Sequence, residues 1–348
     1  MLPLSVCIIA RNEEKHIAEC LKRLVPYDVE IVVVDTGSTD RTVALARQYT
    51  EHIYSFPWCD DFSAAKNYAI GKAANNLILS LDCDEYLEKL DTGALFQRMA
   101  ADPHAAGQIL LQNRYTQNGI PCLERVWVTR LADRRYYQFT GAVHEQLEPL
   151  QGDKLVFKAP VEVLHVGYDV SDSEMEAKAR RNIALLEKEI ETTDSDPYLY
   201  YQLGQSYRRL KQYEKALSCF DMGLSMDVDP SLSYVQTMVE SYGYTLLDLK
   251  RNQEALNLLG IYDDFCRRAD FPFLIGLIYM NNGLFQQAVS EFQKAAQMKD
   301  FSVDGVNSYK AHYNTGVIYE CTGNASKAKE YYQKCGDYEP AKIRLSQL

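Results

Sequence analysis

The sequence has 348 residues, of which 47% are hydrophobic and 24% charged, as expected for a folded protein of about two domains. The formal net charge of −11 argues against nucleic acid as a main partner. No apolar run approaches the roughly 18 residues of a membrane-spanning helix, and the N-terminal segment lacks the basic start of a signal peptide. Nine cysteines without a C-x-x-C pair favour a reducing compartment, so we expect a cytoplasmic protein without disulfides or a zinc site.

The first part of the chain alternates apolar strands with amphipathic helices. Buried strands are expected over 4–10, 30–34 and 77–81, and helices follow the first two at 17–24 and 41–49. This β-α-β-α order predicts a parallel sheet with right-handed crossovers. In such sheets, ligands bind beyond the carboxyl ends of the strands.

Each of these three strands ends in a polar cluster. The clusters are Arg11–Glu13, Asp35–Asp40 and Asp82–Glu85. The last holds three carboxylates, which would repel one another unless a hard divalent cation such as Mg²⁺ or Mn²⁺ offsets the repulsion. A solvated acidic turn is the alternative, but the expected convergence of three polar strand ends favours a binding site.

The following segments predict a further helix and a mixed or antiparallel continuation of the sheet. A helix opens at 61–69 and brings Lys66 and Asn67 close to the strand ends, and another helix is expected over 93–101. Strand-like segments are expected over 107–112, 122–131, 138–147 and 155–165. Turn residues at Asn118-Gly119 and Gln151-Gly152-Asp153 predict hairpins.

Six segments, in chain order, resemble a known family: IIARNEE, VVVDTGSTDRT, FSAAKNYAI, LSLDCDEYL, TRL and VHEQL. They are similar to the family-2 inverting glycosyltransferases of the GT-A fold. The resemblance is strongest to the subgroup of peptide S-glycosyltransferases of glycosylated bacteriocins, flagellin glycosyltransferases and lipopolysaccharide-core glucosyltransferases. It covers residues 1 to about 168 and implies an α/β GT-A domain, with a Rossmann-like nucleotide-sugar-binding fold, over 1–170.

The resemblance assigns roles to the D-x-D segment and to one later glutamate. Mn²⁺ or Mg²⁺ would neutralise the diphosphate of a UDP-sugar, with Asp84 as a direct ligand and Asp82 bound through water or to the ribose. His165 would be a further metal ligand, or else a structural residue. Glu145 would be the general base that deprotonates the acceptor. The residues expected at the nucleotide sugar are Ala10, Arg11, Glu13, Asp35, Lys66, Asn67, Asp82, Cys83, Asp84, Trp127, Arg130 and His144.

Several of these assignments leave an alternative open. Glu13 would hold a ribose hydroxyl and Asp35 the uracil edge, although both residue types also form turns. Lys66 or Asn67 would lie beside the base, unless they belong to a solvated helix face. Arg130 would contact phosphate or acceptor, or pair with a carboxylate of the fold.

The second half of the chain is helical and repetitive. A connecting helix is expected over 171–196, followed by about four tetratricopeptide repeats over 197–348, the second of them degenerate. The marker glycines of the four copies are Gly204, Gly243, Gly276 and Gly316. Helix pairs of this kind stack into a solenoid with a concave groove that suits a peptide or protein segment. A scaffolding or homodimer surface is the alternative use.

Together these features predict an inverting, metal-dependent glycosyltransferase. It would move glucose or N-acetylglucosamine from a UDP-sugar to a Ser, Thr or Cys side chain of a peptide or protein. A glucosyltransferase of cell-envelope polysaccharide or lipopolysaccharide core is the alternative enzyme, and a repeat adaptor with an inactive transferase half is less favoured. Glycoside hydrolysis also uses two carboxylates but gives no reason for the polar ends of the first two strands.

Overall fold

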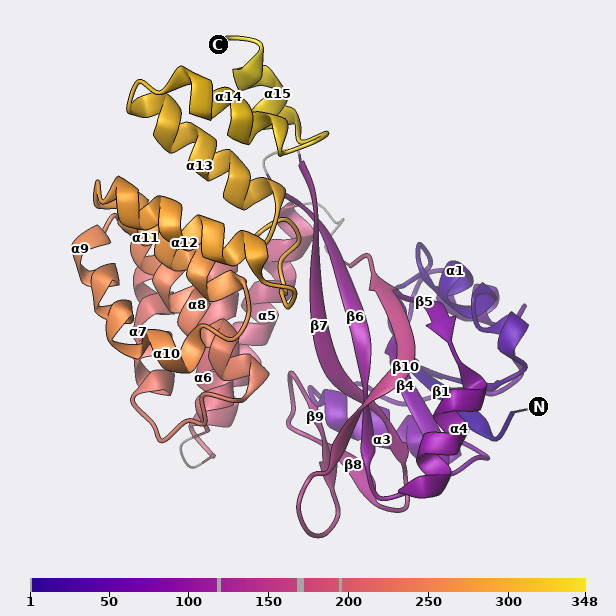
Figure 1. The fold of residues 1–348 in the computed structure, drawn as a ribbon. Coiled ribbons are helices and arrows are strands. Elements are labelled where there is room, and N and C mark those ends of the chain that lie inside the picture. The colour runs from indigo at the N-terminus through magenta and orange to yellow at the C-terminus, as the bar shows by residue number, and fades with distance from the viewer. Residues whose placement is uncertain (1, 118–119, 168–171, 194–195) are drawn as a thin grey trace. The chain divides into compact units, whose positions relative to one another are not determined.

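The computed structural model describes residues 2–117, 120–167, 172–193 and 196–348, and the chain divides into two compact units, residues 1–175 and 176–348 (Figure 1). The first unit is α/β and the second is all-helical, so both predicted fold classes are confirmed. The hairpin turn expected at Asn118-Gly119, and the domain boundary expected at 170, lie outside the described residues.

The first unit is built on a mixed sheet, which has eight strands among the described residues, in the order β3-β2-β1-β4-β7-β6-β10-β5. Four strands run parallel: β1 (Leu4–Ala10), β2 (Glu30–Asp35), β3 (Ile53–Ser55) and β4 (Leu77–Asp82). β1, β2 and β4 are buried on both faces, which is why each appears in the sequence as a continuous apolar run. β1 lies between β2 and β4, so the three polar strand ends converge as predicted.

The rest of the sheet is mixed, again as predicted. It consists of β5 (Glu85–Leu90), β6 (Ala106–Gln117), β7 (Ile120–Asp133) and β10 (Val156–His165). β7 is antiparallel to β4 and β6, whereas β10 is parallel to β6 and antiparallel to β5. β5 follows β4 after a turn of two residues but does not pair with it. Instead, β5 pairs with β10 and forms the edge of the sheet opposite β3.

A second, two-stranded sheet corrects two expectations. It pairs β8 (Tyr137–Thr140) with β9 (Gln146–Pro149), so the single strand expected over 138–147 is interrupted by the loop 141–145. The hairpin predicted at Gln151–Asp153 is wrong, because β9 pairs with β8 while β10 pairs with β5 and β6. That turn instead connects two sheets.

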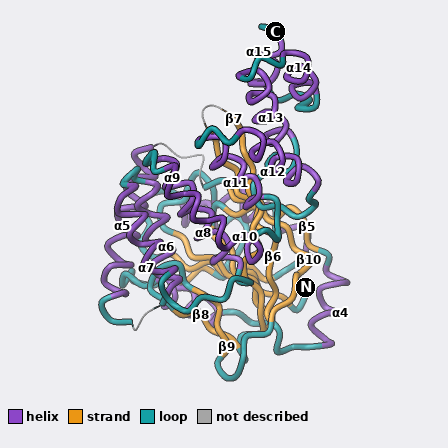
Figure 2. Tube along the Cα trace, turned by 60° about the vertical axis from the view of Figure 1, so that its left-hand side comes forward, coloured by secondary structure: helices purple, strands orange, loops and turns teal. Residues whose placement is uncertain are grey.

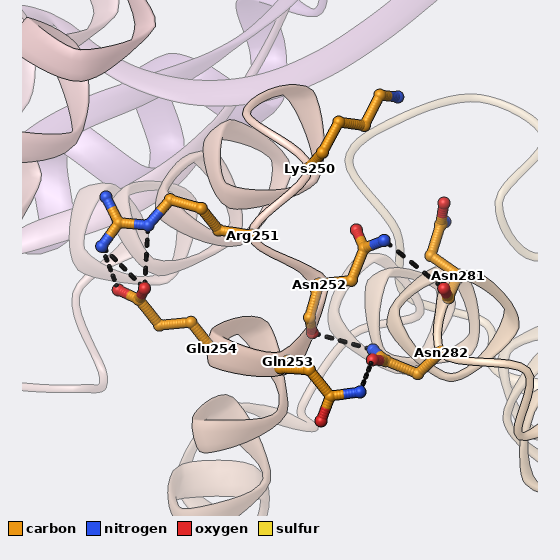
Figure 3. A pocket seen from close by; sticks show the side chains of 7 residues that line it. All are labelled: Lys250, Arg251, Asn252, Gln253, Glu254, Asn281 and Asn282. Carbon is orange, nitrogen blue, oxygen red and sulfur yellow. Dashed lines mark hydrogen bonds and ion pairs between the residues drawn. The ribbon is translucent and has the colours of Figure 1, made fainter.

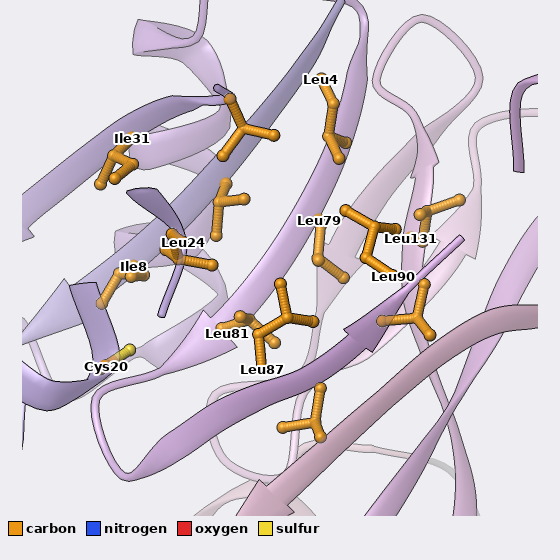
Figure 4. Close-up of a cluster of buried hydrophobic side chains, with 14 of the residues drawn as sticks. Leu4, Ile8, Cys20, Leu24, Ile31, Leu79, Leu81, Leu87, Leu90 and Leu131 are labelled. Carbon is orange, nitrogen blue, oxygen red and sulfur yellow. The ribbon is translucent and has the colours of Figure 1, made fainter. Parts of the chain in front are cut away.

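Helices cover the two faces of the main sheet. α1 (Ile17–Lys22), α2 (Thr42–Ala46) and α4 (Thr92–Ala101) contribute to one buried apolar cluster, which Figure 4 shows around Leu79, Leu81 and Leu131. α3 (Phe62–Lys72) packs on the opposite face through Ala69 and Ile70. A short 3₁₀ helix, η1 (Val25–Tyr27), follows α1.

The second unit consists of stacked helices (Figure 2). Their bounds are α5 (Asp172–Ile190), α6 (Pro197–Arg209), α7 (Tyr213–Leu224), α8 (Ser233–Asp248), α9 (Asn252–Ala255), η2 (Leu256–Ile261), α10 (Tyr262–Phe265), α11 (Asp270–Asn281), α12 (Phe285–Gln297), α13 (Tyr309–Cys321), α14 (Ala325–Gln333) and α15 (Glu339–Leu345). The degenerate second copy has a broken second helix, formed by α9, η2 and α10. No described helix is both long enough and apolar enough to cross a bilayer.

The marker glycines allow the helices of a pair to approach closely. A Cβ atom on Gly204 would lie 2.4 Å from the ring of Phe220, and one on Gly276 would lie 2.6 Å from the ring of Phe292. A side chain at either position would therefore force the two helices apart. These contacts explain why the repeat pattern requires a glycine in one helix and an aromatic residue in the next.

Candidate active site

The carboxyl ends of β1 and β2 are joined by hydrogen bonds between their loops. Asn12, which has a positive φ of 56°, donates its backbone N–H to Ser38 Oγ over 3.0 Å and accepts the Thr39 N–H at Oδ1 over 2.8 Å. The Glu13 N–H donates to Thr42 Oγ1 over 2.7 Å. The polar loops that were predicted to contact the nucleoside therefore form one ordered rim beside Ala10 and Arg11.

Asp35 shapes the loop that follows β2. Its carboxylate accepts the backbone N–H of Gly37 over 3.3 Å and that of Ser38 over 3.1 Å. These bonds agree with the alternative reading of Asp35 as a turn-forming residue. They leave its other lone pairs available, so a further contact with a ligand is compatible with the turn.

A compact cluster of charges lies at the end of β4. The Lys66 side chain from α3 is 4% exposed, and its Nζ lies 2.9 Å from Asp82 Oδ1 and 2.6 Å from Glu145 Oε1. Arg130 lies 3.2 Å from Asp82 Oδ2, 3.5 Å from Glu85 Oε1 and 3.4 Å from Glu145 Oε1. Two cations thus hold together three carboxylates from β4, β5 and the β8–β9 loop, and a solvated helix face is excluded for Lys66.

The pKa values of the cluster reflect burial opposed by ion pairing. Burial and the charge of Arg130 lower the pKa of Lys66, but Asp82 and Glu145 outweigh them and leave it above its ordinary value. Burial raises the pKa of Asp82, but Lys66 and Arg130 hold it well below its usual range. Burial raises the pKa of Glu85 above its ordinary value, against the opposing effect of Arg130. Asp82 is therefore the firmly ionised member of the acidic turn.

A β-bulge directs Arg130 into this cluster. Gly107 of β6 pairs with Leu131 of β7, but the next residue, Gln108, pairs with Thr129, so the register shifts by one residue at Arg130. A bulge changes the direction of a side chain and is common next to active sites. The bulge could not be read from the sequence, because it is defined by the pairing of β7 with β6.

Asp84 and His165 form a second group of polar side chains. His165 Nε2 lies 3.5 Å from Asp84 Oδ2, and its Nδ1 lies 2.9 Å from Asn113 Oδ1. The Asn113 side-chain NH₂ donates to Glu124 over 3.2 Å, and this bond orients the amide. Since Asn113 Oδ1 only accepts, His165 carries a proton on Nδ1 and directs Nε2 toward Asp84. Burial lowers the pKa of His165, but Asp84 outweighs it and leaves a raised pKa.

Gly167 leaves room beside this pair. A Cβ atom there would lie 2.0 Å from Asp84 Oδ2 and 2.6 Å from His165 Nε2. A carboxylate oxygen and an imidazole nitrogen thus lie next to each other beside a residue that has no side chain. This arrangement is compatible with a bound divalent cation. Among the described residues, however, no group of three or more His, Cys, Asp or Glu side chains is arranged as a metal site.

The loop that carries Glu145 is held in a left-handed turn. His144 has a φ of 53° and Gly141 a φ of 93°. The Glu145 side chain is 10% exposed, and its described pairs with Lys66 and Arg130 both use Oε1.

Three other predicted residues lie outside the charge cluster. The Cys83 thiol is buried and donates to Ile9 O over 3.4 Å, so only the backbone of Cys83 remains for a ligand. Trp127 lies three residues before Arg130 on β7, with Lys158 Nζ 4.8 Å from its ring centroid. The Asn67 side-chain amide donates to Phe139 O and accepts the Phe139 N–H. Sequence reasoning missed Asn113, because an asparagine in a strand carries no local signal of a role.

Comparison with known proteins identifies both units. Residues 5–145 match glycosyl transferase family 2, and residues 197–227, 272–300 and 309–342 match tetratricopeptide repeats. The first unit is a family 2 glycosyltransferase domain. The repeats expected in the second half of the chain are likewise confirmed.

Three curated relatives are similar to part of this chain. The chain is 30% identical over 211 residues to a TPR repeat-containing protein of Synechococcus elongatus, covering 59% of this chain and 52% of the relative. It is 29% identical over 227 residues to the prophage-derived glycosyltransferase SunS of Bacillus subtilis, covering 62% and 52%. It is 30% identical over 159 residues to the lipopolysaccharide core biosynthesis glycosyltransferase LpsC of Rhizobium meliloti, covering 42% and 58%. The chain therefore spans about half the length of the curated relatives it matches.

A separate pocket lies in the repeat unit. It has a volume of about 470 Å³ and is lined by Lys250, Arg251, Asn252, Gln253, Glu254, Asn281 and Asn282 (Figure 3). Its polar groups largely bind one another: Gln253 donates to Asn282 Oδ1 over 2.8 Å, and Asn282 donates to the backbone O of Asn252 over 2.8 Å. These bonds join two neighbouring turns of the solenoid, and we assign the pocket no catalytic role.

Proposed function

We propose that the protein is an inverting glycosyltransferase that moves glucose or N-acetylglucosamine from a UDP-sugar to a side chain of a peptide or protein. The observation that carries this proposal is that four segments of the first unit converge at the carboxyl ends of the parallel strands. They are the loops after β1 and β2, the Asp82–Asp84 turn, and the loop that ends in Glu145. The family match of residues 5–145 supports the reaction class.

The nucleoside part of the donor is assigned to the ends of β1 and β2. Glu13 would bind a ribose hydroxyl and Asp35 the uracil edge, with Ala10 and Arg11 in the same rim. The bonds between the two loops keep these groups in place before the donor arrives, which reduces the cost of ordering them.

The charges favour a divalent cation at the diphosphate. When all are ionised, the four carboxylates Asp82, Asp84, Glu85 and Glu145 exceed the two cations Lys66 and Arg130 by two negative charges, which one Mn²⁺ or Mg²⁺ would balance. Asp84 and His165 would hold the ion directly, and Asp82 through water. When bound, it supplies charge neutralisation at the leaving diphosphate.

Glu145 is the proposed general base. Its Oε1 is paired with Lys66 and Arg130, so Oε2 would accept the proton of the acceptor hydroxyl or thiol. The acceptor oxygen or sulfur forms a bond to the anomeric carbon from the face opposite the diphosphate. The bond between that carbon and the diphosphate oxygen breaks, and UDP leaves with the electron pair.

Two observations bear on the acceptor. Helix-pair repeats, which the second unit contains, provide a groove suited to a polypeptide. The similarity to LpsC supports the alternative, a saccharide acceptor in lipopolysaccharide core synthesis. A cytoplasmic location and a homodimer remain predictions, which cell fractionation and gel filtration would test.

The donor is tested by thermal shift, since a ligand that binds only the folded state raises the melting temperature. The chain of 348 residues is heated with UDP-glucose, UDP-N-acetylglucosamine or GDP-mannose, each with Mn²⁺ or with EDTA. We expect stabilisation by a UDP-sugar that depends on Mn²⁺. Stabilisation by the GDP-sugar alone, or by none of the donors, would count against the proposal.

The acceptor is tested with the active protein. The protein is incubated with radiolabelled donor and a bacterial cell extract. After the reaction, the mixture is separated into protein, peptide and lipid fractions. Label in peptide or protein supports the polypeptide acceptor, whereas label in the lipid fraction supports the lipopolysaccharide alternative. An adaptor without catalytic activity would label neither.

A further inference from the structure

Helix α3 binds the segment that leads to the proposed base at several points. The Phe62 N–H, at the start of the helix, donates to Ala142 O over 2.8 Å. Asn67 Nδ2 donates to Phe139 O over 2.8 Å, and Asn67 Oδ1 accepts the Phe139 N–H over 2.9 Å. Lys66 pairs with Glu145. One helix therefore contacts the beginning, the middle and the end of the segment 139–145.

The Asn67 side-chain amide bonds to the backbone of Phe139 as a neighbouring strand would. Phe139 lies in β8 opposite Leu147 of β9, and the two bonds to Asn67 use its N–H and C=O on the other edge of the strand. A side-chain amide that exchanges two bonds with a peptide group fixes that peptide in position and direction. Both halves of the amide are occupied by this contact, which argues against a contact between Asn67 and a nucleobase.

The loop needs such support. His144 adopts a left-handed conformation, which is unfavourable for a residue with a side chain and persists only where the surroundings hold it. Its neighbour Glu145 must keep Oε2 directed at the acceptor. Phe139 lies two residues before Gly141 and five before His144, the two left-handed positions of the loop. Loss of the anchor at Phe139 would therefore release this loop and misplace the Glu145 carboxylate.

We propose that Asn67, together with Lys66, positions Glu145 for catalysis and does not contact the nucleoside. This inference rests on the proposed function of Glu145. It replaces the expectation that Lys66 and Asn67 lie beside the base. A displacement of about 1 Å at a reacting group can lower a rate by about 100-fold, so the anchor affects turnover even though it lies away from the reacting atoms.

Asn67 is the cleaner probe, because Lys66 also pairs with Asp82. The wild-type chain and Asn67→Ala are compared. Lys72→Ala is the matched control on the last turn of α3, where Lys72 lies over the rings of Tyr54 and Tyr68. UDP release from UDP-glucose and UDP-N-acetylglucosamine is measured with Mn²⁺, and UDP binding is measured by calorimetry. Hydrogen exchange of a peptide covering 140–147 is measured without substrate.

We expect Asn67→Ala to lower kcat at least tenfold, to leave the donor KM and the UDP affinity within twofold, and to speed exchange in 140–147. We expect Lys72→Ala to match the wild type. An unchanged kcat would overturn the inference, as would a loss of UDP affinity at unchanged kcat, which indicates a direct nucleoside contact.

A second variant and the exchange measurement test the inference if the first experiment fails. If Asn67→Ala does not fold, Asn67→Asp decides by the same criteria, because it keeps the acceptor for the Phe139 N–H and loses the donor to Phe139 O. If the wild type releases no UDP, the proposed function fails, but the exchange measurement still tests the anchor. Unchanged exchange in 140–147 on substitution of Asn67 would then reject it.

Discussion

At the scale of single residues, the site depends on side chains that hold others in place. Arg130 contacts carboxylates from three separate segments, and Asn113 fixes the ring of His165. The sequence predicts Asp82, Asp84 and Glu145 as site residues, because carboxylates at strand ends and a matching motif indicate their chemistry, and the structure pairs Asp82 and Glu145 with the same two cations. Arg130 was predicted without its partners, since the bulge that directs it depends on the pairing of β6 with β7.

Removal of Arg130 should destabilise the first unit. Arg130→Met leaves Asp82, Glu85 and Glu145 with Lys66 as the remaining cation of the cluster, which should cost about 1–3 kcal/mol of unfolding free energy. Urea denaturation measures this change. The control is Arg41→Met, which removes an exposed ion pair with Glu14 and should have little effect. Equal effects of the two substitutions would contradict the role assigned to Arg130.

Gly167→Ala should disturb the Asp84–His165 pair. Its Cβ would overlap both donors, so we expect weaker binding of UDP in the presence of Mn²⁺ and little change in its absence. Calorimetry with Mn²⁺ and with EDTA separates the two conditions. Gly71→Ala is the control, because a Cβ on Gly71 meets nothing within 4 Å. If Gly167→Ala binds UDP and Mn²⁺ like the wild type, Asp84 and His165 do not hold the ion.

At the scale of elements, the buried parallel strands were the most predictable part, because both faces of β1, β2 and β4 are apolar. β5 was missed, since its first residue, Glu85, looks like part of an acidic turn although it is 2% exposed. The break between β8 and β9 was also missed. The segment 138–147 alternates like one strand, and only its contacts with α3 show where the chain leaves the sheet.

The repeat helices provide a prediction at this scale. Gly276→Ala places a Cβ 2.6 Å from the Phe292 ring, so overpacking should lower the unfolding free energy by about 1–3 kcal/mol. Urea denaturation of the full chain, followed by circular dichroism, measures the change. A Cβ on Gly260 meets nothing within 4 Å, so Gly260→Ala should be close to neutral. A neutral Gly276→Ala would show that α11 and α12 do not pack through this glycine.

At the scale of the whole molecule, the chain joins a family 2 glycosyltransferase domain to tetratricopeptide repeats. The order of these two parts was predictable because each has its own pattern, apolar strands with polar ends in one and a glycine–aromatic repeat in the other. The choice of sugar and acceptor was not predictable. It depends on the shape of surfaces that several segments form together, which no local sequence pattern indicates.

The central claim, that the acidic turn and Glu145 perform metal-dependent glycosyl transfer, is tested most directly by UDP release. Four proteins are assayed with UDP-glucose and UDP-N-acetylglucosamine: the wild type, Asp84→Ala, Glu145→Gln and the control Glu88→Gln. Glu88 is an exposed β5 residue paired with Arg23. We predict release by the wild type and the control that stops with EDTA and returns with Mn²⁺, and a loss of at least 100-fold in the other two variants. Equal release by Asp84→Ala and the wild type, or release that persists in EDTA, would contradict the account.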